Sequence, residues 1–189
     1  MEMKIGKKQI AFYGVKGYWN YLTEPNREGQ FTTQIVITEE MADEIEEKFN
    51  KKPTNLAMKN KQEVKNAKKA DRTPVMFEGS DDDYVLNLTQ TSTWPSGDPR
   101  QISVSLEGKA FTDGVGGGTV MNILCNTAMT SKGLGMYLDK VGIVDLVEAE
   151  FSTGGGEDEF EGFDEVDMGA PKPPAKSSSD FEDDDDPFA

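Results

Sequence analysis

The chain has 189 residues, a length that suits one folded domain with a tail. Its formal net charge of −15 is unevenly distributed: residues 1–151 hold 18 Lys/Arg against 22 Asp/Glu, and residues 152–189 hold 2 against 13. The acidity is mostly a property of the C-terminal part, so it does not exclude a body that binds nucleic acid. The sequence has no histidine and one cysteine, which removes the commonest general base and zinc ligand and any intrachain disulfide.

These features favour a protein that is not an enzyme and that holds no metal and no cofactor. Cys125 lies in an apolar run, where a buried small hydrophobic side chain is the expected role. No stretch approaches 18 uninterrupted apolar residues, and the N-terminus lacks the apolar core of a signal peptide. We therefore expect a cytoplasmic protein with no membrane partner.

Strand patterns dominate the body. Segments rich in β-branched and aromatic residues, bounded by Gly, Pro, Asn or Asp, predict strands. They are residues 9–15, 30–37, 73–79, 84–91, 101–106, 119–129 and 135–148. Several strands with glycine-punctuated turns favour a small closed barrel.

The segment 16–22 places three aromatic residues, Tyr18, Trp19 and Tyr21, within four positions beside Lys16. Three large rings so close together are difficult to bury in one place. In a strand, Trp19 and Tyr18 point to opposite faces. We therefore expect one face of this strand to be core and the other to present an exposed ring.

A helix is predicted from Thr38 to about residue 50. Thr38 suits the N-cap, and the acidic residues that follow it suit the positive end of the helix dipole. Met41, Ile45 and Phe49 form an apolar stripe at i, i+4 and i+8.

A basic segment follows, with nine Lys/Arg and two acids between residues 48 and 72. Four of its lysines share one helical face by their spacing of three or four residues: Lys61, Lys65, Lys68 and Lys69. Like charges on one face destabilise a helix unless a polyanion neutralises them. The segment predicts contact with DNA phosphates, and a solvated helix face is the alternative.

Two further segments invite a catalytic interpretation. Asp81–Asp83 could contribute to a metal site, but the sequence offers no convergent set of oxygen ligands, so a polar turn is expected. The glycine-rich stretch 110–118 lacks the Gly-Lys-Ser/Thr ending of a phosphate loop, so it is predicted to be a flexible loop between strands.

The C-terminal part is predicted to consist of a linker followed by a short peptide that binds a partner. Residues 152–179 combine glycine, an acidic cluster with two phenylalanines and a Pro/Ser spacer, and predict a flexible linker. Residues 180–189 hold five consecutive acids followed by Pro-Phe, too few apolar groups to fold, and predict a disordered, extended peptide. Such a peptide is expected to dock its phenylalanine in a Lys/Arg-rimmed pocket, while a purely solubilising tail is the alternative. The expected partner contacts are Asp183, Asp184, Asp185, Asp186, Pro187 and Phe188.

This tail resembles those of single-stranded-DNA-binding proteins from bacteria and bacteriophages, which end in acids plus an aromatic residue. The body adds further similarity to the phage proteins in Phe111–Gly114, Thr119–Ile123 and Lys132–Leu146. The resemblance implies an OB-fold replication protein, often dimeric through tail exchange. It implies a tail that recruits DNA polymerase, helicase/primase or nuclease and competes with DNA, inside a bacterial host cell during infection.

The fold prediction is therefore a mainly β, OB-fold-like five-stranded barrel with one or two helices in residues 1–151. The leading functional prediction is sequence-independent binding of single-stranded DNA in replication, recombination and repair. Positive side chains would neutralise phosphates, and rings would stack on bases. The predicted DNA contacts are Lys4, Lys7, Lys16, Tyr18, Trp19, Tyr21, Lys59, Lys61, Lys65, Lys68, Lys69, Arg72, Phe77, Trp94 and Arg100.

Two other classes of function compete with this prediction. An acidic protein that mimics DNA or binds a partner's DNA site would explain the net charge, but the basic segment argues against it. A nuclease that uses Asp81–Asp83 for metal would need an acid constellation that the sequence does not offer.

Overall fold

The computed structural model describes residues 1–131 and 133–149. The predicted linker, 152–179, and the predicted partner-binding tail, 180–189, lie outside the described residues. The fold below is that of the predicted body.

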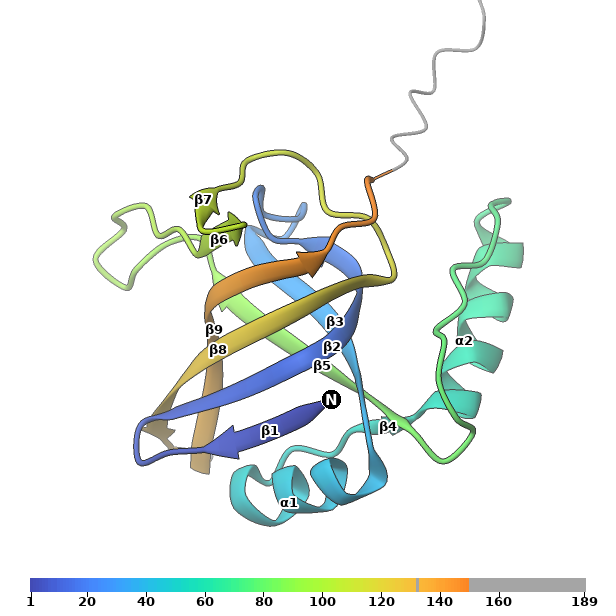
Figure 1. Ribbon diagram of the computed structural model, residues 1–189, viewed down its shortest axis with the longest axis horizontal. Coiled ribbons are helices and arrows are strands. Elements are labelled where there is room, and N and C mark those ends of the chain that lie inside the picture. The colour runs from blue at the N-terminus through green and yellow to red at the C-terminus, as the bar shows by residue number, and fades with distance from the viewer. Residues whose placement is uncertain (132, 150–189) are drawn as a thin grey trace, which may run out of the picture. The chain divides into compact units, whose positions relative to one another are not determined.

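The described residues form one sheet and two helices (Figure 1). The strands are β1 Glu2–Ile5, β2 Gln9–Tyr21, β3 Gln30–Ile37, β4 Thr54–Asn55, β5 Tyr84–Thr91, β6 Ser103–Leu106, β7 Lys109–Ala110, β8 Thr119–Thr130 and β9 Gly133–Asp145. The helices are α1 Glu39–Phe49 and α2 Leu56–Lys69. Along the sheet the strand order is β4-β5-β3-β2-β8-β9-β6-β7, and β1 pairs with β2.

Five of these strands make a barrel. β2 pairs antiparallel with β3 and with β8, β3 pairs with β5, and β8 pairs with β9. β5 and β9 lie against each other. There the side chain of Gln90, which is 3% exposed, donates from Nε2 to the Leu138 carbonyl oxygen at 3.2 Å. This order is that of a partly open five-stranded OB-like barrel, so the predicted fold class is confirmed.

The barrel interior is filled by alternate side chains of its strands. The largest fully buried ones include Phe12, Ile35, Leu88, Met121 and Leu138. α1 lies below the barrel (Figure 1), and its residues Ala42, Ile45 and Phe49 belong to the same core. The predicted start of this helix is confirmed, because Thr38 Oγ1 accepts a hydrogen bond from the Met41 N–H at 3.4 Å.

Cys125 is fully buried in this core, as predicted. Burial raises the pKa of its thiol to about 12. The thiol is therefore protonated at neutral pH, and its role is packing rather than nucleophilic chemistry.

The predicted strand at residues 73–79 is wrong, because that segment is irregular and lies against α2. Side chains of the helix take the backbone bonds that a neighbouring strand would otherwise make. Asn60 bonds both the N–H and the carbonyl oxygen of Phe77, at 2.8 and 3.0 Å. Glu63 Oε1 accepts from the Val75 N–H at 3.1 Å. Polar residues on α2 thus decide the structure of the segment that follows it.

Residues 111–118 of the glycine-rich stretch form the predicted loop between strands, here β7 and β8, while Ala110 belongs to β7. Gly116 N–H donates to the Val147 carbonyl oxygen at 2.8 Å. Thr119 Oγ1 accepts from the Val147 N–H at 3.1 Å. These bonds tie the loop to the segment that follows β9.

Neither α1 nor α2, the two helices of the described residues, has the length and apolar character that crossing a membrane requires.

Gly116 and Gly117 provide a matched test of this loop. A Cβ at Gly116 would lie 2.7 Å from the Val147 carbonyl oxygen and would also clash with the backbone of Glu148, whereas a Cβ at Gly117 would lie 3.4 Å from Tyr18. We expect Gly116→Ala to lower the free energy of unfolding by about 1–3 kcal/mol and Gly117→Ala to change it little. Urea denaturation measures both, and equal stability of the two variants would contradict this packing.

Candidate nucleic-acid interface

A bulge in β2 lies among its aromatic residues. The register between β2 and β3 shifts between Tyr18 and Tyr21. Inside the shift, Trp19 has φ 53°, a left-handed conformation that costs a residue with a side chain roughly 1–2 kcal/mol. Asn20 fixes the bulge, because its Nδ2 donates to the Gly116 carbonyl oxygen at 2.8 Å.

Tyr18 and Phe77 are buried, each 3% exposed, and their ring centroids lie 4.7 Å apart. They belong to a small second cluster, with Val36, Leu56 and Val85, outside the main core. The predictions that Tyr18 and Phe77 stack on bases are therefore wrong. Both rings pack between the barrel and α2 and have no free face.

Trp19 is half-buried, and Tyr21 is 44% exposed, so these two rings remain available. The guanidinium Cζ of Arg72 lies 4.7 Å from the centroid of the Trp19 ring, within the range of a cation–π contact. Arg72 Nη1 donates to Glu63 Oε1 at 2.6 Å. The sequence prediction included Trp19 and Arg72 separately, and the structure brings them together.

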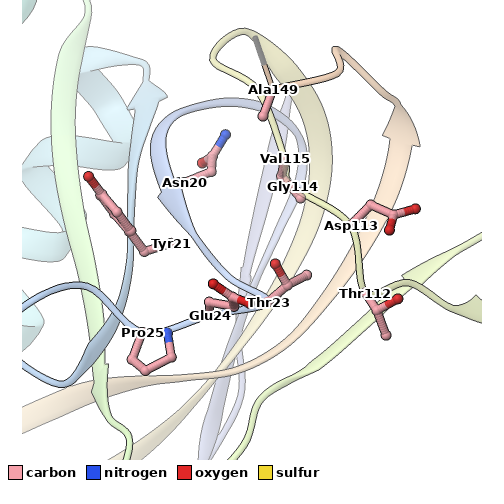
Figure 2. A pocket seen from close by; sticks show the side chains of 10 residues that line it. All are labelled: Asn20, Tyr21, Thr23, Glu24, Pro25, Thr112, Asp113, Gly114, Val115 and Ala149. Atoms are coloured by element: carbon pink, nitrogen blue, oxygen red, sulfur yellow. The ribbon is translucent and has the colours of Figure 1, made fainter. Parts of the chain in front are cut away.

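Two open clefts meet at Asn20 and Tyr21. The Trp19 cleft, about 660 Å³, is lined by Trp19, Asn20, Tyr21, Val75, Val115, Gly116, Gly117, Val147, Glu148 and Ala149. The Tyr21 cleft, about 630 Å³, is lined by Asn20, Tyr21, Thr23, Glu24, Pro25, Thr112, Asp113, Gly114, Val115 and Ala149. Figure 2 shows its walls: the end of β2 and the turn after it on one side, the stretch 112–115 on the other.

The residues that line the two clefts include Glu24, Asp113 and Glu148, and none of these lining residues is Lys or Arg. Most of the remaining lining is apolar or uncharged. Such a surface suits a flat, uncharged group that carries amino donors better than it suits a phosphate. Phosphates of a bound strand would have to lie outside the clefts.

Positive charge is concentrated on one face of α2. The helix packs against its neighbours through Leu56, Glu63 and Ala67, which are buried. The opposite face carries exposed lysines that make no ion pair with any described residue: Lys61, Lys65, Lys68 and Lys69. We call these four residues the lysine face. The structure therefore places the lysine face and the clefts on different sides of the α2 segment.

The other predicted contacts lie in separate places. Lys59 Nζ lies 5.9 Å from the Phe77 ring centroid. Lys16 pairs with Glu78 at 2.6 Å, which raises the pKa of Lys16 through the hydrogen bond and the negative charge. Lys4 pairs with Glu2 at 3.3 Å on β1, and Lys7 is exposed in the turn that follows β1.

Trp94 and Arg100 form a second Trp–Arg pair in the loop after β5. The guanidinium Cζ lies 3.8 Å from the ring centroid, and Trp94 is 48% exposed. This loop is joined to the turn after β2, because Ser92 N–H donates to the Gly29 carbonyl oxygen at 2.9 Å. Trp94 does not line either cleft.

Sequence reasoning missed Asn20 and Glu63. Glu63 had a signal: it is the one acid in α2 and is spaced seven residues after Leu56, on the apolar stripe. Asn20 had no signal, because its partner Gly116 is 96 residues away in the chain.

Asp81–Asp83 form a turn, as predicted, in which Asp83 Oδ2 accepts from the Ser80 N–H at 2.7 Å. Across residues 1–131 and 133–149, the His, Cys, Asp and Glu side chains make no cluster of three or more that could hold a metal ion.

The barrel with its ring-lined clefts places the body in the OB-like class of folds. No protein-family model and no curated protein sequence matches the chain. Among solved structures, the chain is similar to the single-stranded DNA-binding protein from bacteriophage Enc34, with 11% identity, 82% of this chain and 95% of that chain covered, and a TM-score of 0.42.

A C-terminal truncation of that phage protein matches with 10% identity, 78% and 94% coverage of the two chains and a TM-score of 0.40. Its complex with ssDNA matches with 10% identity, 78% and 95% coverage and a TM-score of 0.40. The similarity to phage single-stranded-DNA-binding proteins that the sequence indicated is thus present among solved structures.

The backbone at Trp19 yields a prediction about stability. Glycine adopts φ near 53° without the steric penalty that a Cβ brings, so Trp19→Gly should be more stable than Trp19→Ala by about 1 kcal/mol. At Tyr21, which has no positive φ, the order should reverse. Thermal unfolding of the four variants checks this, and the same order at both positions would rule out strain at Trp19.

Proposed function

We propose that the body of this protein binds single-stranded DNA with little sequence preference. The observation that carries the proposal is Trp19: a half-buried ring on a backbone with a strained φ of 53°, in cation–π contact with Arg72 and set in the wall of a cleft. Backbone strain of this kind persists where the surrounding structure enforces it, and it gathers at ligand sites.

The ring geometry favours single strands over duplex. Every base of a single strand offers a π-face, and base stacking on an aromatic side chain is worth on the order of 1–3 kcal/mol. Trp19 and Tyr21 line the walls of adjoining clefts, and the acids there, Glu24, Asp113 and Glu148, can accept bonds from base amino groups. In a duplex the base faces are covered by their neighbours, so a duplex would not use these clefts.

The lysine face supplies the electrostatic part. Its four ammonium groups have no ion-pair partner among the described residues, so a polyanion can neutralise them without breaking an existing bond. The one acid of α2, Glu63, is buried and already bound to Arg72. A strand that uses both sites would pass around α2, with one part of its backbone on the lysine face and the bases of another part in the clefts.

The acidic tail adds a regulatory role in DNA replication, recombination and repair. Residues 152–189 carry 13 acids against 2 lysines, and a tether of that length gives an effective concentration in roughly the millimolar range. The tail competes with DNA for the lysine face, and DNA binding frees Phe188 to recruit a polymerase, a helicase/primase or a nuclease. This role belongs to the cytoplasm of an infected bacterium, and tail exchange between two copies would make a homodimer.

Tryptophan fluorescence titrations with oligo(dT) and with duplex DNA of equal length test the proposal. Affinity for oligo(dT) should exceed that for duplex and fall steeply with salt. Lys61→Gln with Lys65→Gln should reduce the slope of log K against log salt by about 0.7 per lost phosphate contact. Lys109→Gln with Lys140→Gln, two exposed lysines elsewhere, should leave the slope unchanged. Tighter binding to duplex, or equal slopes for the two pairs, would contradict the proposal.

Deleting residues 152–189 should tighten oligo(dT) binding severalfold, most clearly at low salt, where charges are least screened. Phe188→Ala should leave DNA affinity nearly unchanged, because charge rather than the ring competes with DNA, and should abolish recruitment of the partner. The measurement is the same titration with the truncated chain and with the Phe188→Ala chain. A truncated body that binds DNA no better than the full chain at low ionic strength would refute the competition.

A further inference from the structure

Glu63 is the one acid of α2, and its residue is only 5% exposed. Removing a carboxylate from water costs several kcal/mol unless bonds to a cation and to N–H groups replace the lost hydration. A helix rich in lysine could place this acid on its exposed side at no such cost. The buried position therefore needs a reason.

The carboxylate of Glu63 is tied to the segment that follows α2. Its Oε1 accepts from Arg72 Nη1 at 2.6 Å and from the Val75 N–H at 3.1 Å. Burial by itself would raise the pKa of Glu63, but the hydrogen bonds from Arg72 and Val75 and the positive charges of Arg72 and Lys59 outweigh it, so this pKa is lowered. The group is a carboxylate at neutral pH.

The chain reverses after α2 to bring Arg72 back to this carboxylate. Asp71 has φ 50°, and the Arg72 N–H donates to the Ala67 carbonyl oxygen at 3.1 Å, one turn back along the helix. The guanidinium contacts two groups: Nη1 binds Glu63, and Cζ lies 4.7 Å from the centroid of the Trp19 ring. The same nitrogen also donates to the Thr73 carbonyl oxygen at 3.1 Å, so Arg72 is held by two acceptors, whereas a surface arginine without partners is not held in place.

We propose that Glu63 is a positioning residue for base binding: it holds the Arg72 guanidinium on one side of the Trp19 ring and so fixes the orientation in which that ring meets a base in the Trp19 cleft. This role rests on the proposed function. This role explains why Glu63 lies on the buried side of α2. On the exposed side, Glu63 would not reach Arg72, and it would place a negative charge among the lysines of the lysine face. The role also explains why Val75, which lines the same cleft, shares the carboxylate.

The test uses the full chain with Trp94→Phe, so that Trp19 is the only tryptophan and its fluorescence can be measured alone. Glu63→Gln keeps the shape of the side chain and removes its charge. We expect acrylamide quenching of Trp19 in the absence of DNA to increase, and affinity for oligo(dT) to fall roughly threefold or more, the scale of coupling within one bonded network. Arg72→Lys, which keeps the charge but loses the planar fork, should do the same. The double variant should be no worse than Arg72→Lys alone.

Glu44→Gln is the matched control, because it also replaces a carboxylate by an amide, breaks the exposed Lys48–Glu44 pair on α1, and involves no predicted DNA contact. It should change neither measurement. If folded Glu63→Gln and Arg72→Lys chains both keep the parental quenching and affinity, Glu63 is structural only and the inference is wrong. If the parental chain binds no oligo(dT), the proposed function itself fails, whereas quenching without DNA still decides whether Glu63 positions Trp19.

Discussion

The bulge at Trp19 is the constraint from which the arrangement of this surface follows. β2 is shared by β1, β3 and β8, so its backbone is held on both edges, and the register with β3 must shift within it. The bulge sends Tyr18 under α2 and leaves Trp19 and Tyr21 facing open clefts. Asn20 secures it through a bond to the loop at Gly116. That bond joins the bulge to a segment 96 residues further along the chain, so this surface forms only when both segments are in place.

Around this surface, negative and positive side chains of α2 differ in their burial. The acid of α2 is buried against Arg72, while the four lysines of the lysine face are exposed and have no ion-pair partner among the described residues. Acids line the clefts, where a phosphate would be repelled and a base amino group accepted. In the proposed function, the bases and the backbone of a bound strand would therefore be recognised by different elements, the bases by the end of β2 and the backbone by α2. In a chain of net charge −15, such local sorting matters more for function than the total.

Much of the fold was predictable because its signals are local. The alternation in residues 30–37 and 84–91 corresponds to β3 and β5, and Thr38 caps α1 as its sequence indicated. The segment 73–79 also has a strand-like composition, yet α2 captures its backbone through Asn60 and Glu63. Composition reports how well a residue suits a pleated surface and says nothing about whether a competing partner will take its N–H groups. That competition is settled only when distant parts of the chain meet.

By itself the sequence determined α1, the barrel strands, the burial of Cys125 and the presence of a basic helix face, since these depend on spacing within a few turns or strands; the short strands β1, β4 and β7 were not predicted. It also singled out the aromatic group at 18–21, but not which ring is exposed. Tertiary structure alone decided that Tyr18 and Phe77 are packed together, that Arg72 lies on Trp19, and that the lysine face points away from the clefts. The reason is that each of these outcomes depends on contacts between segments far apart in the chain, whose relative placement no local pattern encodes.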